Sequence, residues 1–246
     1  MKLSFLGTGS GSYRGTGRYP SGAIVDGLLL DCGAGSTGRL HELRRFEEVE
    51  AVLLSHLHSD HIGGLLDFLL HTVILGRTRP LTIVSPPGLR PILETLAAAR
   101  STVQDPSRAY PLTVVESESP ALVVGGWTVR GLPLSHTVPN VGYLASRDGT
   151  AIFYTGDTRE PTATHSVRAD VLIHDATYDD DHRELGRQFG HSTGTQSAEA
   201  AIAMGARRLF LTHLSDAPDL ERRVAAESRR LFPDTDVASD GATFEL

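Results

Sequence analysis

A dense group of metal-binding residue types lies near residue 60 of the sequence. Within the segment SHLHSDHIGG, three histidines and one aspartate fall inside six residues, at His56, His58, Asp60 and His61. The chain has 11 histidines in 246 residues, so such a grouping rarely arises by chance. Neutral imidazole and carboxylate groups suit zinc, and manganese or iron can bind the same groups. The segment therefore predicts a metal site.

The spacing within this group indicates two ions rather than one. The group directly follows residues 51–54, a wholly apolar run that predicts a strand buried on both faces. Alternate residues of an extended chain point to the same side, so His56 and His58 can bind one ion. The chain then turns, and Asp60 and His61 can face a second ion.

Further ligands are expected where other strands end. A single histidine or aspartate in such a place is often only a turn residue or a cap, but here the same placement recurs three times. Because a carboxylate has two oxygens, Asp157 can bridge two cations. The three residues, which follow the strand-like runs 128–133, 151–155 and 208–212, are His136, Asp157 and His213.

The elements that must position these residues alternate along the chain. Strands dominate each half and helices follow them, which predicts an α/β fold with two sheets face to face and helices outside, a four-layer αββα sandwich. No linker or repeat divides the sequence, so residues 1–246 are expected to form a single domain. The predicted strands are 2–6, 23–25, 28–31, 51–54, 81–85, 122–124, 128–133, 141–146, 151–155, 170–174, 208–212, 237–238 and 243–246, and the predicted helices are 35–46, 65–75, 88–100, 196–204 and 219–231.

Composition excludes several classes of protein. With 30 acidic and 23 basic residues the net charge is −7, so the overall charge does not favour binding of nucleic acid. A polyanion must therefore bind to a local basic patch or to bound cations. No apolar run approaches the roughly 20 residues that span a bilayer, so no membrane partner is expected. The single cysteine rules out an intramolecular disulfide. We therefore expect a cytoplasmic protein.

Taken together, these residues resemble the ligand set of the metallo-β-lactamase superfamily. The flanking sequences narrow the resemblance to ribonuclease Z and its close relatives. The motifs that carry it are 56–61 with His136, Asp157 and His213, then HDATY at 174–178, GHST at 190–193 and THLS at 212–215.

The resemblance implies a role for each residue. The first metal would take His56, His58, His136 and Asp157, and the second would take Asp60, His61, His213 and the bridging Asp157. Zinc is the first choice for both, with manganese or iron as alternatives. Two such cations activate a shared water for attack on phosphorus near neutral pH. Asp60 could also orient or deprotonate that water.

Two residues outside the ligand set are also expected to act in catalysis. The resemblance implies that His191 protonates or stabilises the leaving oxygen, although it could instead be a helix-entry residue beside an N-cap at Ser192 or Thr193. Asp175 stands where the family usually has glutamate, and it can hold His191 in one tautomer.

The chain departs from the family at its periphery. Many bacterial members carry a long basic arm between the third histidine ligand and the bridging aspartate, whereas only a hairpin separates His136 from Asp157 here. After Ser215 comes Asp216-Ala217-Pro218 instead of the arginine-containing stretch that ribonuclease Z often has. The predicted substrate is therefore a phosphodiester held without an arm: a short RNA end such as that of a tRNA precursor, or a small or cyclic phosphodiester.

Two other functions remain open at this point. The same metals could hydrolyse a lactone, a carbon ester or a sulfate ester. The chain could instead be a non-catalytic member that binds metal or a ligand. The family is often homodimeric, so a homodimer is possible here as well.

Overall fold

The computed structural model describes residues 1–11, 17–98, 106–159, 167–215 and 217–246. The strands are β1 (Lys2–Gly7), β2 (Gly22–Val25), β3 (Leu28–Leu30), β4 (Ala51–Leu53), β5 (Leu81–Ser85), β6 (Leu112–Glu116), β7 (Ala121–Val124), β8 (Trp127–Leu134), β9 (Asn140–Arg147), β10 (Thr150–Tyr154), β11 (Val171–Asp175), β12 (Arg208–Thr212), β13 (Thr235–Val237) and β14 (Thr243–Glu245). The helices are α1 (Ser36–Glu42), α2 (Ser59–Ile62), α3 (Leu65–Ile74), α4 (Leu89–Ala98), α5 (Pro106–Ala109), α6 (Arg183–Phe189), α7 (Gly194–Met204) and α8 (Pro218–Leu231).

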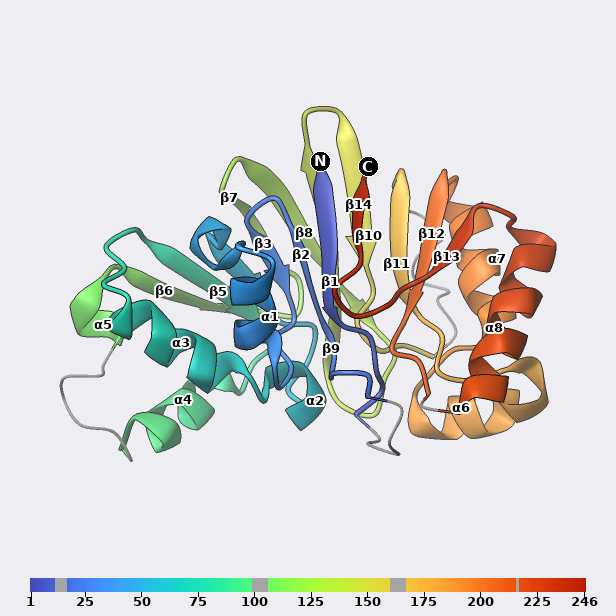
Figure 1. Cartoon of the computed structure of the whole chain (residues 1–246), viewed down its shortest axis with the longest axis horizontal. Coiled ribbons are helices and arrows are strands. Elements are labelled where there is room, and N and C mark those ends of the chain that lie inside the picture. Colours follow the sequence, from blue (N-terminus) through green and yellow to red (C-terminus); the bar gives the residue numbers. More distant parts are fainter. Residues whose placement is uncertain (12–16, 99–105, 160–166, 216) are drawn as a thin grey trace.

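Two seven-stranded sheets form the centre of the molecule (Figure 1). Their strand orders are β14-β1-β2-β3-β4-β5-β6 and β13-β12-β11-β10-β9-β8-β7. Helices α1 to α5 cover the first sheet, and α6 to α8 lie on the side of the second. This arrangement confirms the predicted αββα sandwich.

Three apolar clusters hold the four layers together, and the alternation of side chains along each strand explains how. In β1, Leu3 and Phe5 point into the cluster between the sheets, whereas Leu6 joins the cluster under the helices of the first sheet. In and after β4, Leu53 faces the opposite sheet and Leu54 faces those helices. The third cluster packs α7 and α8 on the second sheet. Strands buried on both faces require the nearly continuous apolar runs that the sequence has.

The direction of the strands gathers their ends at one edge. Strands β3 to β6 run parallel in the first sheet, and β10 to β13 run parallel in the second. Ligands of open α/β sheets bind outside the carboxyl ends of such strands. The residues that follow β3, β4, β8, β10, β11 and β12 are therefore the ones that can meet.

The predicted elements agree with the structure except in a few places. The helix predicted at 35–46 ends at Glu42, because Arg44 adopts a left-handed φ of 56° and Arg45 donates its backbone N–H to Leu40. This reversal lets Phe46 stack on His41 and enter the core. Residues 99–100 of the helix predicted at 88–100 lie outside the described residues.

Among the strands and α-helices of the described residues, four were not predicted: β6, α2, α5 and α6. The three helices among them are too short to show a helical apolar period. None of the described helices is long and apolar enough to cross a membrane.

Candidate metal centre and active site

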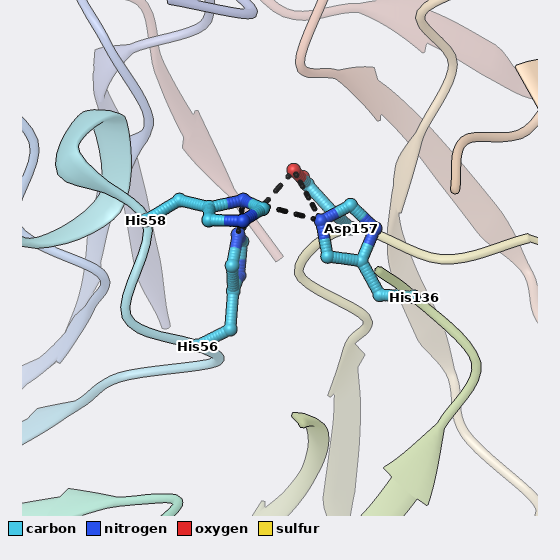
Figure 2. A group of neighbouring side chains, drawn as sticks. All are labelled: His56, His58, His136 and Asp157. Atoms are coloured by element: carbon cyan, nitrogen blue, oxygen red, sulfur yellow. Dashed lines mark hydrogen bonds and ion pairs between the residues drawn. The ribbon is translucent and has the colours of Figure 1, made fainter. Parts of the chain in front are cut away.

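The structure brings all seven predicted ligands to one place between the ends of the two sheets. His56, His58, Asp60 and His61 come from the segment between β4 and the end of α2 in the first sheet. The other three follow strands of the second sheet: His136 after β8, Asp157 after β10 and His213 after β12. Figure 2 shows four of them pointing toward a common centre.

The first group consists of His56, His58, His136 and Asp157, whose ligand atoms lie within 4.8 Å of one another. His58 Nδ1 is 3.0 Å from His56 Nε2 and 3.3 Å from His136 Nε2. His56 Nε2 is 3.6 Å from Asp157 Oδ2. Two ligands bound tetrahedrally at zinc bond lengths stand roughly 3.3 Å apart. The separations therefore suit a single ion.

The second group consists of Asp60, His61 and His213. Asp60 Oδ2 is 3.4 Å from His213 Nε2 and 3.7 Å from His61 Nε2. Asp157 Oδ2 also lies 3.2 Å from His213 Nε2 and 3.3 Å from His61 Nε2. One carboxylate oxygen therefore contacts both groups, as a bridging ligand would.

Buried polar atoms show that this donor set fits cations. Within the described part of the chain, His61 Nε2 and Asp157 Oδ1 are buried and have no hydrogen-bond partner. Leaving such an atom unpaired costs about 1–3 kcal/mol. Four carboxylates also gather here, those of Asp31, Asp60, Asp157 and Asp175, and their mutual repulsion needs positive charge nearby. Divalent cations held by these groups would offset this repulsion.

Hydrogen bonds behind the histidines aim their Nε2 lone pairs at the centre. His136 Nδ1 donates to the carbonyl oxygen of Gly190 at 2.8 Å, and His61 Nδ1 donates to Asp31 Oδ2 at 2.7 Å. Ser55 Oγ donates its one proton to Asp31, so its 3.0 Å contact with His56 Nδ1 must have the imidazole as donor. Such partners fix the tautomer of a metal-binding histidine.

The same pattern holds for His213. Its Nδ1 lies 2.8 Å from Thr177 Oγ1. That hydroxyl also contacts two groups that can only accept, Asp175 Oδ1 and the His213 carbonyl oxygen, each at 2.7 Å. The hydroxyl proton therefore goes to one of these acceptors, and His213 Nδ1 donates to the hydroxyl.

Asp31 is a supporting residue to which the sequence assigned no role. It is fully buried at the end of β3 and accepts from the Ser55 backbone N–H, from Ser55 Oγ and from Tyr154 Oη, besides His61. Tyr154 reaches it from the opposite sheet. Its sequence signal is the Asp31-Cys32-Gly33 segment directly after an apolar strand, a segment that also fits the resemblance to ribonuclease Z.

Replacing Asp31 with asparagine is expected to weaken metal binding by about 10–100-fold. The amide loses the negative charge that orients His61 and strengthens it as a ligand. Competition with a chromogenic zinc chelator measures the affinity, and Asp67→Asn, at an exposed carboxylate on α3, is the control. Unchanged zinc affinity in Asp31→Asn would contradict this role.

Two glycines permit the close packing around the ligands. Gly156 has φ +56°, and a Cβ there would lie 2.2 Å from the Cβ of Ser55. Gly190 has φ +87°, and its Cβ would lie 2.5 Å from His136 Nδ1. Any side chain at these positions would displace Asp157 or His136 from the centre.

The electrostatic environment favours the metal-binding forms of most ligands. Burial lowers the pKa of His56, His58 and His136, which keeps these rings neutral. Burial opposes ionisation of Asp157, but the neighbouring histidines outweigh it and hold its pKa well below the usual range. His61 is also fully buried, yet the carboxylates of Asp157 and Asp31 raise its pKa and stabilise positive charge at its ring.

His191 lies beside the ligands and is held by Asp175. Its Nδ1 is 3.0 Å from Asp175 Oδ2, and its ring centroid is 4.9 Å from that of His213. Burial lowers the pKa of His191, but the Asp175 carboxylate outweighs this effect and raises the pKa to about 9. Thr193 is the N-cap of α7 and forms a capping box with Gln196, so the N-cap alternative is correct for Thr193 and is compatible with a role for His191.

Comparison with known proteins assigns the class. Residues 27–214 match the family described as the beta-lactamase superfamily domain. Ribonuclease Z of Halobacterium salinarum is 30% identical over 311 aligned positions, covering 100% of this chain and 97% of that protein. The chain belongs to the β-lactamase superfamily and, within it, to the ribonuclease Z family of metal-dependent hydrolases.

Solved structures agree with this assignment. The short form of human tRNase Z is 26% identical, with a TM-score of 0.77 over 100% of this chain and 99% of that one. The metallo-beta-lactamase fold protein YhfI of Bacillus subtilis covers 100% of this chain with a TM-score of 0.81 and 22% identity, a likeness that concerns the fold alone.

Proposed function

We propose that the chain is a two-metal phosphodiesterase of the ribonuclease Z type that hydrolyses short RNA ends, such as the 3′ end of a tRNA precursor. The observation that carries the proposal is the position of Asp157 Oδ2, within 3.2–3.8 Å of ring nitrogens from both ligand groups. Two divalent cations, zinc as first choice and manganese or iron as alternatives, would supply an activated water and offset charge on the phosphoryl oxygens.

Each of the two groups of neighbouring side chains would hold one cation. His56, His58, His136 and Asp157 would hold the first cation, and Asp60, His61, His213 and Asp157 the second. Asp60 is partly exposed, with a side chain 20% accessible, so its carboxylate can also orient or accept a proton from the attacking water.

His191 provides the proton for the leaving oxygen. Asp175 engages Nδ1, so Nε2 is the atom that can donate. The ring is 15% exposed and lies next to His213 and His136, which places it at the rim where substrate enters. Protonation of the leaving oxygen contributes typically 10²–10⁴-fold to such a reaction.

The substrate is held without a long arm. Between His136 and Asp157 the described chain forms only the hairpin of β9 and β10. With a net charge of −7, affinity for RNA must come from the cations and from local contacts. A short RNA end fits these conditions, and a small or cyclic phosphodiester is the alternative substrate.

A side-by-side panel of substrates tests the proposed function. Zinc-loaded protein is assayed with a 3′-extended RNA, methyl p-nitrophenyl phosphate, a cyclic nucleotide, a lactone and an aryl sulfate. Phosphodiester turnover should exceed lactone and sulfate turnover. A dominant lactonase or sulfatase rate would replace this function with the ester alternative, and no turnover at all would favour a non-catalytic member.

Asp175→Asn is expected to move the alkaline limb of the pH–rate profile to lower pH, by about one unit or more. His191 can donate only while protonated, so activity falls as the pH rises through its pKa. Asp175 raises that pKa, and removing its charge lowers it. Profiles of kcat for RNA check this. A limb that stays in place or moves to higher pH would show that His191 is not the acid.

Three sequence predictions accompany this proposal and stay predictions. They are the single domain spanning residues 1–246, the homodimer and the cytoplasmic location.

A further inference from the structure

A pocket of 570 Å³ opens beside the second ligand group. Its volume is in the range of small-molecule sites, roughly 300–1,000 Å³. One of its walls includes Thr177, whose hydroxyl contacts His213 Nδ1. Its lining includes Tyr178, His182, Leu185, Leu220 and Arg223.

We propose that this pocket binds the nucleotide next to the scissile phosphate, on the leaving-group side. The base of this nucleotide stacks on Tyr178. The other phosphate of the same nucleotide, which is not cleaved, is bound by Arg223. The inference rests on the proposed function, because it assumes that the scissile phosphate lies at the metal centre and that His191 protonates the leaving oxygen.

The position of Tyr178 places the pocket on the leaving-group side of the scissile phosphate. Its ring centroid lies 6.1 Å from that of His191, so a group in the pocket is adjacent to the proton donor. Leu185 is 40% exposed although it lines the pocket, and with Leu220 it adds apolar surface beside the aromatic ring. Aromatic and apolar side chains in such a place accept the face of any base.

Arg223 is oriented for an anion. Its Nε donates to Asp179 Oδ2 at 2.5 Å, and Asp179 is fully buried. The Arg223 side chain is 51% exposed, and no residue of the described chain accepts a hydrogen bond from its two terminal nitrogens. A guanidinium fixed along one edge presents the other edge as a planar fork, which suits phosphate.

The surroundings of Arg223 make this more than an ordinary ion pair. His182 Nδ1 contacts the same Asp179 carboxylate at 2.5 Å, so two groups that can carry positive charge share one negative charge.

Ligand binding tests the inference without turnover. Zinc-loaded protein is titrated with cytidine 3′,5′-bisphosphate, with each cytidine monophosphate and with inorganic phosphate. The bisphosphate should bind about tenfold more tightly than either monophosphate, because only it can contact the metal centre and Arg223 together. Arg223→Gln should abolish this advantage and leave the affinity for inorganic phosphate unchanged.

The controls separate Arg223 from general loss of charge. Arg207→Gln removes an exposed arginine that also pairs with a carboxylate, Asp170, but does not line the pocket. It should keep the bisphosphate advantage. Arg223→Lys keeps the charge without the fork and should give an intermediate value. If Arg223→Gln keeps the advantage, or lowers the affinity for inorganic phosphate equally, the assignment is wrong.

Kinetics test the stacking residue. Tyr178→Leu should raise KM for RNA by roughly 5- to 150-fold, whereas Tyr178→Phe should keep the wild-type value. KM for methyl p-nitrophenyl phosphate, which has no base, should change less than twofold in both. Equal effects on the two substrates would overturn the inference. Failure of wild-type protein to hydrolyse any phosphodiester would instead overturn the proposed function.

Discussion

Asp157→Asn is expected to lower kcat by at least about a thousandfold and to reduce the metal content from two ions per chain to one or none. The carboxylate oxygen Oδ2 contacts ring nitrogens of both ligand groups, and in the proposed site it would be the ligand shared by the two cations. An asparagine has one neutral oxygen, which cannot hold two cations together.

Elemental analysis and steady-state kinetics check this result. Asp148→Asn is the matched control, since Asp148 lies at the β9–β10 turn with its side chain 85% exposed. This control should keep both ions and the full rate. An Asp157→Asn protein that retains two ions and more than a tenth of the activity would contradict the bridging role.

His191→Ala is expected to lower kcat for RNA by roughly 10²–10⁴-fold while both ions stay bound. The loss should be less than about tenfold for methyl p-nitrophenyl phosphate, because p-nitrophenolate leaves without needing a proton. The difference between the two substrates separates loss of a proton donor from loss of a metal ligand.

The control for this variant is His41→Ala, at a residue whose ring stacks on Phe46 away from the centre. Equal losses on both substrates, or loss of an ion, would show that His191 acts as a ligand instead. Its ring nitrogen does lie within 4.8 Å of ligand atoms of Asp157 and His213, so this outcome has a geometric basis.

The sequence predicted which residues come together, because the candidate ligands follow strand ends. His136, Asp157 and His213 are far apart along the chain, but each follows a strand whose end lies at the same edge of its sheet. The apolar alternation predicts these strands, and the sandwich then places their ends together. Site and fold were therefore predicted by the same reasoning.

The supporting contacts could not be predicted because they cross between elements. Tyr154 reaches Asp31 from the opposite sheet, and this pairing has no local signal. Arg223 meets Asp179 across 44 residues of sequence. The short helix α6 has no apolar period, so the pocket wall it provides was also not predicted. Such contacts become visible only once the layers are packed.

Anomalous diffraction data collected at the zinc edge from crystals of zinc-loaded protein would locate the cations. We expect two peaks about 3.5–4 Å apart, one beside His56, His58 and His136 and one beside Asp60, His61 and His213, with Asp157 between them. A single peak, or peaks away from Asp157, would contradict this expectation.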